Sequence, residues 1–161
     1  MKKGNDIIKM AKSPALLRMY MLRHLPMGAL AGLKILEMDR THAIVSVPYK
    51  YLNKNPFRSI YFAVLSMAAE LSSGIIALAL LADAPVPVSM LVLNMQANFT
   101  KKARGKIRFE CRDGAQITTA IEESIKSGEG KTVEVSSTGY DSAGDVVAVF
   151  QFTWTFKPKT G

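Results

Sequence analysis

One long apolar stretch restricts the possible folds of this chain more than any other feature of its sequence. Residues 60–81 are almost wholly apolar, and Glu70, near their middle, is the only charged residue among them. A carboxylate among Val, Leu, Met and Ala side chains is costly to desolvate, so it must be paired, solvated by a cavity, or protonated. Ser66 and Ser73 precede and follow Glu70 at helical spacing, which puts the three polar side chains on one face of a helix.

Three interpretations of this helix compete. About 20 apolar residues suffice to cross a bilayer, which would make the stretch a membrane span. A central Glu costs about 2.5–3.5 kcal/mol in that setting, and the sequence offers no second span. The other two interpretations place the helix in a protein core, with Glu70 either a satisfied structural group or a working carboxylate. We therefore expect no membrane span, and a central helix over residues 59–81 that is wrapped by a sheet.

Length and charge limit the class of protein. The 161 residues fit a single globular domain over the whole chain, 1–161. The net charge of +8 favours an anionic partner, such as nucleic acid, an anionic membrane surface or a phosphorylated small molecule. The same charge can simply keep a protein soluble, so it does not choose among these partners.

Cysteine content and the start of the chain indicate the compartment. Cys111 is the only cysteine, which excludes an intramolecular disulfide and fits a reducing environment. The first residues are basic but contain no apolar signal-peptide region. We therefore expect a cytoplasmic protein.

The residues before the apolar stretch predict one helix and two strands. The helix predicted over residues 14–25 starts with a Ser-Pro cap and is amphipathic, with Arg18 and Arg23 on its solvent side. Alternating apolar residues then predict two strands within residues 33–49 that turn near Asp39.

A proline-rich break at residues 83–87 ends the central helix, and a long strand follows over residues 88–100. Strict alternation puts one set of apolar residues on one face of this strand, namely Leu91, Leu93, Met95, Ala97 and Phe99. The opposite face then carries Asn94 and Gln96, which either line a site or face solvent.

The rest of the chain is predicted as strands with one short helix near residues 117–125. A basic cluster comes first, made of Lys101, Lys102, Arg104, Lys106 and Arg108. The last strand has one wholly apolar face, made of Val146, Ala148, Phe150, Phe152, Trp154 and Phe156. The sequence contains no Cys/His metal spacing and no evident Ser/His/Asp set, so we expect neither a metal nor a resident cofactor.

This order of elements resembles the hotdog fold of the acyl-CoA thioesterases, an α+β fold in which a curled antiparallel sheet wraps around one long central helix. Within that superfamily the chain resembles the phenylacetate-pathway type, whose members carry Asn-x-x-Gly-x-x-His-Gly-Gly before the helix and an Asp or Glu nine residues after the His. Asn55 lies six residues before Tyr61 and Glu70 lies nine residues after it, so both end positions match. The segment 97–105 also resembles the family's strand and turn after the helix.

The middle of the motif departs from this pattern. Arg58 stands at the first Gly position, Tyr61 at the His position, and Phe62 and Ala63 at the last two Gly positions. The chain is therefore similar to a divergent hotdog branch of thioesterase type rather than to a member with the full signature.

The resemblance implies a thioester hydrolase that forms a homodimer, or a dimer of such dimers, because family members build each site from the helix start of one subunit and the acidic residue of the other. In this implied site, backbone N–H groups near Tyr61 and Phe62 hold the thioester oxygen, and Glu70 orients or deprotonates the attacking water. Asn55 and Ser73 would assist Glu70 or the water.

The resemblance also implies how an acyl-CoA substrate would be held. The implied substrate-binding residues are Phe62, Arg58, Asn94, Gln96, Lys101, Lys102 and Arg104. The last three would meet the phosphates of coenzyme A, which enters as part of the substrate and not as a cofactor.

Two other functions remain open. A protein with the same pocket that only binds an acyl or lipid ligand is favoured by the bulky Tyr61 and Phe62, which hinder close approach to the backbone. A nucleic-acid binder is suggested by net charge alone. The basic residues 101–108 include no aromatic side chain that would stack on bases, so we expect no nucleic-acid partner.

Overall fold

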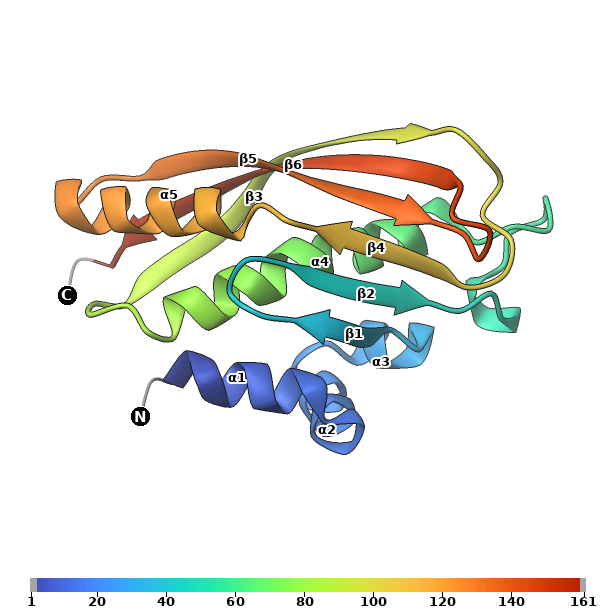
Figure 1. The fold of residues 1–161 in the computed structure, drawn as a ribbon, viewed down its shortest axis with the longest axis horizontal. Coiled ribbons are helices and arrows are strands. Elements are labelled where there is room, and N and C mark those ends of the chain that lie inside the picture. The colour runs from blue at the N-terminus through green and yellow to red at the C-terminus, as the bar shows by residue number, and fades with distance from the viewer. Residues whose placement is uncertain (1–2, 160–161) are drawn as a thin grey trace.

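The computed structural model describes residues 3–159, and Figure 1 shows the arrangement of their elements. The first elements are α1 (Lys3–Lys12), α2 (Pro14–His24), α3 (Pro26–Ala31), β1 (Lys34–Met38), β2 (Ala43–Val47) and the short 3-10 helix η1 (Tyr51–Asn53). The remaining elements are the central helix α4 (Phe62–Leu81), β3 (Val88–Phe99), β4 (Ile107–Cys111), α5 (Gly114–Ser127), β5 (Lys131–Tyr140) and β6 (Val146–Pro158). The predicted domain range also includes residues 1, 2, 160 and 161, which lie outside the described residues.

The strands of the described chain form one antiparallel six-stranded sheet in the order β1-β2-β4-β5-β6-β3. Helix α4 packs against the inner face of β2, β4 and β5, and it contacts β6 less. The sheet curls because a helix that is apolar on nearly all sides must be covered on several sides. The predicted α+β hotdog fold, a curled antiparallel sheet wrapped around one long helix, is confirmed.

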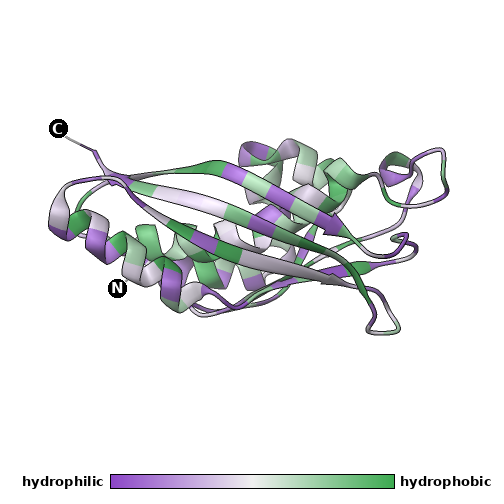
Figure 2. Ribbon diagram, turned by 90° about the horizontal axis from the view of Figure 1, so that it is seen from above, coloured by the Kyte–Doolittle hydropathy of each residue, from purple (hydrophilic) through white to green (hydrophobic). Residues whose placement is uncertain are grey.

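The strands alternate between core and outer face, and Figure 2 shows this alternation as bands of opposite hydropathy. The inner face is made of fully buried side chains, which include Ala43, Val45, Val47, Ile107, Phe109, Phe150 and Phe156. Val146, predicted on this face, is instead 38% exposed, because β6 begins there beside an irregular pairing with Tyr140. Gly139 is needed opposite Phe109, since a Cβ atom there would lie 2.5 Å from the phenyl ring.

Helix α4 is a core helix. Among residues 3–159, it is the one helix that is long and apolar enough to match a membrane span, and most of it is buried by the fold. It begins at Phe62 rather than at Ser59, because the residues before it are held in a loop. The Ile60 N–H donates to the Ala103 carbonyl at 2.9 Å, and the Tyr61 N–H donates to the Asn53 carbonyl at 2.8 Å.

The N-terminal region differs from its sequence prediction. It contains two helices that were not predicted: α1 lies before α2, and α3 follows it because α2 ends before Leu25 and Pro26 starts a new helix. Helix α2 is also not amphipathic: its buried side chains are Leu17 and Met21, and the apolar side chains on its other sides are exposed. Arg18 and Arg23 are exposed, as predicted, but they share the surface with Leu and Met.

A β-bulge changes the predicted faces of β3. The pairing with β6 shifts register between Val92 and Asn94, so Leu93 is an extra residue in the strand. Residues on the two sides of the bulge therefore share the inner face, namely Met90, Val92, Met95, Ala97 and Phe99. The prediction that grouped Leu91 and Leu93 with Met95 is wrong, because alternation continues only while no residue is inserted. Asn94 and Gln96 lie on the outer face of the sheet and are exposed.

Candidate active site

The loop before α4 is held by a buried asparagine. The Asn53 side chain is 1% exposed, and its Nδ2 donates to the carbonyls of Ala31 and Pro48, both at 2.8 Å. Because the Asn53 carbonyl also accepts the Tyr61 N–H, this residue ties α3, the end of β2 and the start of α4 together. Sequence reasoning passed over Asn53. The only sign of its role in the sequence is its position two residues before Asn55, where the motif described above begins.

Asn55 organises the same loop through hydrogen bonds that its side-chain oxygen accepts. Its Oδ1 accepts the backbone N–H of Phe57 at 3.0 Å, and the N–H and hydroxyl of Ser59 at 3.2 Å. Arg58 is exposed at the turn with a φ of 59°, the left-handed region that glycine adopts most readily. This is the position at which the motif that the sequence resembles carries glycine, so Arg58 adopts a backbone conformation that glycine would reach at lower cost.

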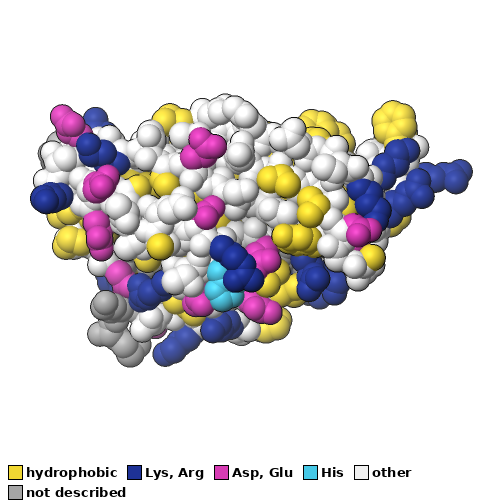
Figure 3. Space-filling view, turned by 45° about the horizontal axis from the view of Figure 1, so that its top comes forward, with side chains coloured by type: hydrophobic (Ala, Val, Ile, Leu, Met, Phe, Trp, Pro, Cys, Tyr) yellow, Lys and Arg dark blue, Asp and Glu magenta, His cyan; other side chains and the backbone are white. Residues whose placement is uncertain are grey.

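A pocket of about 590 Å³ lies at the start of α4, between this loop and the end of β3. Among the sequence-predicted site residues, the pocket brings together Asn55, Tyr61, Phe62, Lys101 and Lys102. Figure 3 shows basic side chains gathered at the end of the molecule where Figure 1 places the loops on either side of this pocket. The pocket therefore combines apolar walls with positive charge.

The first backbone N–H groups of α4 point out of the helix at this pocket. Tyr61 is the cap residue and its side chain makes no capping hydrogen bond. The Tyr61 carbonyl accepts the N–H groups of Val64 and Leu65, and within residues 3–159 no acceptor is found for the N–H groups of Phe62 and Ala63. A helix start with unpaired N–H groups binds an anion or a developing oxyanion.

Aromatic side chains connect the pocket to the core. The ring centroids of Tyr61 and Phe62 lie 4.9 Å apart, those of Phe62 and Phe99 6.4 Å, and those of Phe99 and Phe150 5.6 Å. Tyr61 and Phe62 are 46% and 53% exposed, so the outer end of this aromatic row is open to a ligand or a partner. Phe99 was not among the predicted site residues.

The basic turn after β3 is partly neutralised. Lys101 Nζ lies 2.6 Å from Asp141 Oδ2 and 2.7 Å from Asp145 Oδ2. The hydrogen bond from Lys101 lowers the pKa of Asp141, and the same bond raises the pKa of Lys101. Lys102 is exposed beside this pair, and the described residues offer it no carboxylate partner.

Glu70 lies outside this pocket, on the open side of α4. The residues on that side are only partly buried, namely Ala63, Ser66, Met67, Glu70, Gly74 and Leu78. The carboxylate extends over Gly74, where a Cβ atom would lie 3.0 Å from Glu70 Oε1. Burial raises the pKa of Glu70, and within residues 3–159 no side chain or N–H group donates a hydrogen bond to its carboxylate.

Ser73 supports the helix packing beneath Glu70. It is fully buried, its hydroxyl donates to the Glu70 backbone carbonyl at 3.1 Å, and its Oγ accepts the Trp154 Nε1–H at 3.0 Å. These contacts fix the indole beside Gly74 and do not reach the Glu70 carboxylate. Ser73 thus holds the Trp154 ring on the core side of α4, next to the turn of helix that carries Glu70.

The predicted residues fall into two groups within one chain. One group lines the pocket at the start of α4, and the other consists of Glu70 and Ser73 further along the helix. Glu70 follows Phe62 by eight positions, and a rise of 1.5 Å per residue puts them about 12 Å apart along α4. Arg58 and Arg104 do not line the pocket, and the outer-face position of Asn94 and Gln96 takes them away from both groups. Among residues 3–159 no group of three or more His, Cys, Asp or Glu side chains is placed so that it could hold a metal ion.

Several solved structures share this fold at low sequence identity. A protein from Pseudomonas aeruginosa, described as of unknown function and as a probable thioesterase, is 21% identical with a TM-score of 0.75, over 91% of this chain and 97% of that one. A protein of unknown function from Chlorobaculum tepidum is 15% identical with a TM-score of 0.75, over 92% of this chain and 99% of that one. A thioesterase from Haemophilus influenzae is 12% identical with a TM-score of 0.64, over 91% of each chain. These likenesses establish the fold.

A comparison with models of protein families assigns the sequence to a family. No curated protein matches the sequence. The family model described as "Domain of unknown function (DUF4442)" matches residues 14–156, which is most of the chain. The chain belongs to the DUF4442 family.

Proposed function

We propose that this protein is a cytoplasmic acyl-CoA thioesterase that works as a homodimer, with Glu70 as its general base. The observation that carries the proposal is the Glu70 carboxylate, half-buried and without a hydrogen-bond donor among the described residues, on the open side of the central helix of a hotdog fold. The structurally similar proteins include one described as a probable thioesterase and one described as a thioesterase, which supports this choice. The matching positions of Asn55 and Glu70 support kinship with the phenylacetate-pathway type.

The chemistry follows from the two groups of residues. The thioester carbonyl lies at the start of α4, where the N–H groups of Phe62 and Ala63 stabilise the oxyanion. Glu70 takes a proton from water as the oxygen of that water bonds to the carbonyl carbon. The carbon–sulfur bond then breaks, and the leaving thiolate takes the proton back from Glu70. The products are the free acid and coenzyme A.

A second copy of the chain completes the site. The separation of about 12 Å along α4 prevents the two groups of one chain from acting on the same carbonyl. Strand β3 is an edge of the sheet, and its exposed apolar side chains include Leu91, Leu93 and Met95. An unpaired edge of this kind accepts another strand, so pairing of two β3 strands would bring Glu70 of one copy toward the helix start of the other.

The basic turn and the inner face of β3 supply the substrate contacts in this proposal. Lys102 and Arg104 meet the phosphates of coenzyme A, and Lys101 holds the turn through Asp141 while adding to the positive field. The acyl chain lies between the open side of α4 and the inner apolar residues of β3, such as Met90 and Val92.

The test is release of free thiol from acyl-CoAs of several chain lengths by the wild type and by Glu70→Gln. Gln keeps the shape of the side chain but cannot act as a base, so turnover falls on the order of 10²-fold while substrate affinity hardly changes. Glu123→Gln, an exposed position on α5, is the matched control and retains full turnover. Unchanged turnover in a folded Glu70→Gln variant removes Glu70 from the mechanism.

A protein that binds acyl groups without hydrolysing them is the second candidate. The exposed rings of Tyr61 and Phe62 favour it, because they occupy positions at which the related motif carries His and Gly and they narrow access to the helix start. This function predicts saturable binding of acyl-CoA by the wild type, with no thiol released above the uncatalysed rate and no effect of Glu70→Gln.

A further inference from the structure

The N-terminal part of the chain has an unusual charge distribution. Residues 7–36 contain no Asp or Glu, and their basic residues are Lys9, Lys12, Arg18, Arg23 and Lys34. This segment folds as most of α1, all of α2 and α3, and the start of β1. Its charge is therefore concentrated on one side of the fold, next to the sheet edge formed by β1.

The same segment exposes large apolar side chains. The α2–α3 face, as we define it, consists of Leu16, Met19, Leu22, Leu25, Met27 and Leu30, each 41–64% exposed. Within α2 only Leu17 and Met21 are buried, so the helix is apolar on its solvent side as well as on its core side. A concentration of exposed apolar residues on this scale marks an interaction surface rather than scattered exposure.

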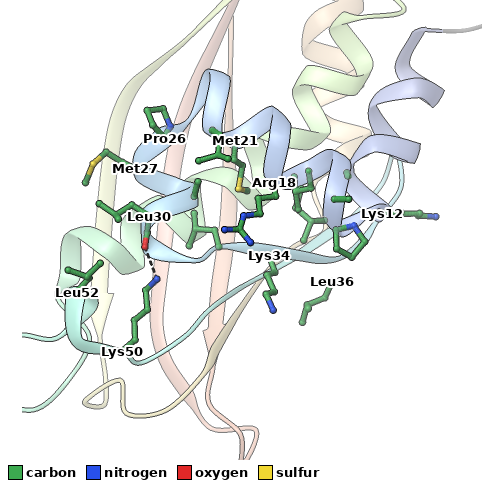
Figure 4. Close-up of a pocket in the computed structure, with 18 residues that line it drawn as sticks. Lys12, Arg18, Met21, Pro26, Met27, Leu30, Lys34, Leu36, Lys50 and Leu52 are labelled. Carbon is green, nitrogen blue, oxygen red and sulfur yellow. Dashed lines mark hydrogen bonds between the residues drawn. The ribbon is translucent and has the colours of Figure 1, made fainter.

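A cavity opens beside this face. Its volume is about 1160 Å³, and it is lined by residues of α2, α3 and β1 with Lys50 and Leu52 at one end. Figure 4 shows Arg18 reaching from α2 toward β1, and Lys50 donating to the Leu30 carbonyl, a bond of 2.6 Å. The lining contains Lys12, Arg18, Lys34 and Lys50 and no acidic residue. Within residues 3–159 no carboxylate pairs with Arg18 or Lys34.

We propose that the α2–α3 face docks on an anionic lipid bilayer. Apolar side chains of the face enter the interfacial region, and the surrounding cations contact anionic headgroups. A second copy of the chain is a poor occupant, because it brings the same cations and a net charge of +8. The proposal goes beyond the proposed hydrolysis and does not depend on it, since none of these residues belongs to the candidate active site.

The test is co-sedimentation of the full chain with vesicles of phosphatidylcholine alone and of phosphatidylcholine mixed with phosphatidylglycerol. Binding to the mixed vesicles and little binding to the neutral ones is the expected result, with affinity falling as salt is added. Met19→Asp places a charge at the centre of the apolar face and weakens binding on the order of tenfold. Val86→Asp, an exposed loop position away from this face, leaves binding unchanged.

A matched pair of charge reversals separates docking from general attraction. Arg23→Glu and Lys126→Glu give the same net charge, but only Arg23 lies beside the α2–α3 face, whereas Lys126 is on α5. Arg23→Glu weakens binding about fivefold or more, and Lys126→Glu has a smaller effect. Circular dichroism checks that each variant is folded. Equal losses in the two reversals, or no binding of the wild type to the mixed vesicles, overturns the proposal. In the second case an acidic protein partner becomes the better occupant.

Discussion

At the scale of single residues, Glu70 couples stability to pH. Burial raises its pKa above the ordinary value of 4.5, so the folded state binds the proton of this carboxyl more tightly than the unfolded state does. The resulting stabilisation is fully present below the unfolded pKa and is lost as the pH rises through the folded pKa. In the proposed mechanism Glu70 acts in its charged form, and that form prevails at the pH values where Glu70 contributes least to stability.

This coupling predicts how Glu70→Gln changes stability. Gln carries no proton to lose, so the variant gains stability relative to the wild type as the pH rises from the ordinary pKa of 4.5 through the raised pKa of the folded state. Melting temperatures of both proteins across this range give the measurement. A difference between them that stays constant with pH would mean that the pKa of Glu70 is not raised. If hydrolysis occurs, the acidic limb of kcat/KM for the wild type also lies above pH 4.5.

At the scale of elements, a buried hydrogen bond joins α4 to β6. Ser73→Ala leaves the Trp154 Nε1–H without its acceptor in the core, which costs about 1–3 kcal/mol of unfolding free energy. Ser66→Ala is the matched control, because its hydroxyl bonds only to the carbonyl of Phe62 near the surface. Denaturant unfolding of the two variants compares them, and near-ultraviolet circular dichroism reports the indole. Equal losses would show that the bond to Trp154 contributes nothing beyond the helix itself.

The turn between β3 and β4 carries a second prediction at this scale. Replacing Lys102 and Arg104 with Ala raises KM for acyl-CoA on the order of tenfold at low salt, because phosphate contacts are lost, and salt reduces the difference. A thioester that lacks the nucleotide is affected little. Lys101→Ala instead lowers stability, since Asp141 and Asp145 lose their shared cation. Equal losses for both substrates would return Lys102 and Arg104 to the role of solvated surface.

At the scale of the whole molecule, the proposed homodimer depends on the edge strand β3. Leu91→Lys with Leu93→Lys places two charges on the exposed edge and converts a dimer into a monomer at about micromolar concentration. Light scattering gives the mass, and thiol release checks that hydrolysis is lost with the partner. Val86→Lys adds charge at an exposed site outside β3 and preserves the dimer. A wild-type protein that is monomeric yet hydrolyses acyl-CoA would refute the two-copy site.

The sequence by itself predicted the central helix, the alternating strands and hence the fold. An apolar stretch with one charge is stable mainly in a protein core, which predicts the central helix. The periodicity that predicts the strands depends only on residues close in the chain. The sequence also singled out Glu70 as a candidate catalytic residue, because a lone carboxylate among apolar residues is visible in the sequence, and that role stays a prediction.

Tertiary structure decided what depends on residues far apart in the chain. The bulge at Leu93 moved Met95 to the inner face and Asn94 to the outer one, and pairing with β6 sets that register. Lys101 is paired with the carboxylate of Asp141, which lies 40 residues away in the sequence. The sequence also could not show that one apolar side of α2 is exposed. Periodicity tells which residues are apolar, but not how many of them the fold can cover.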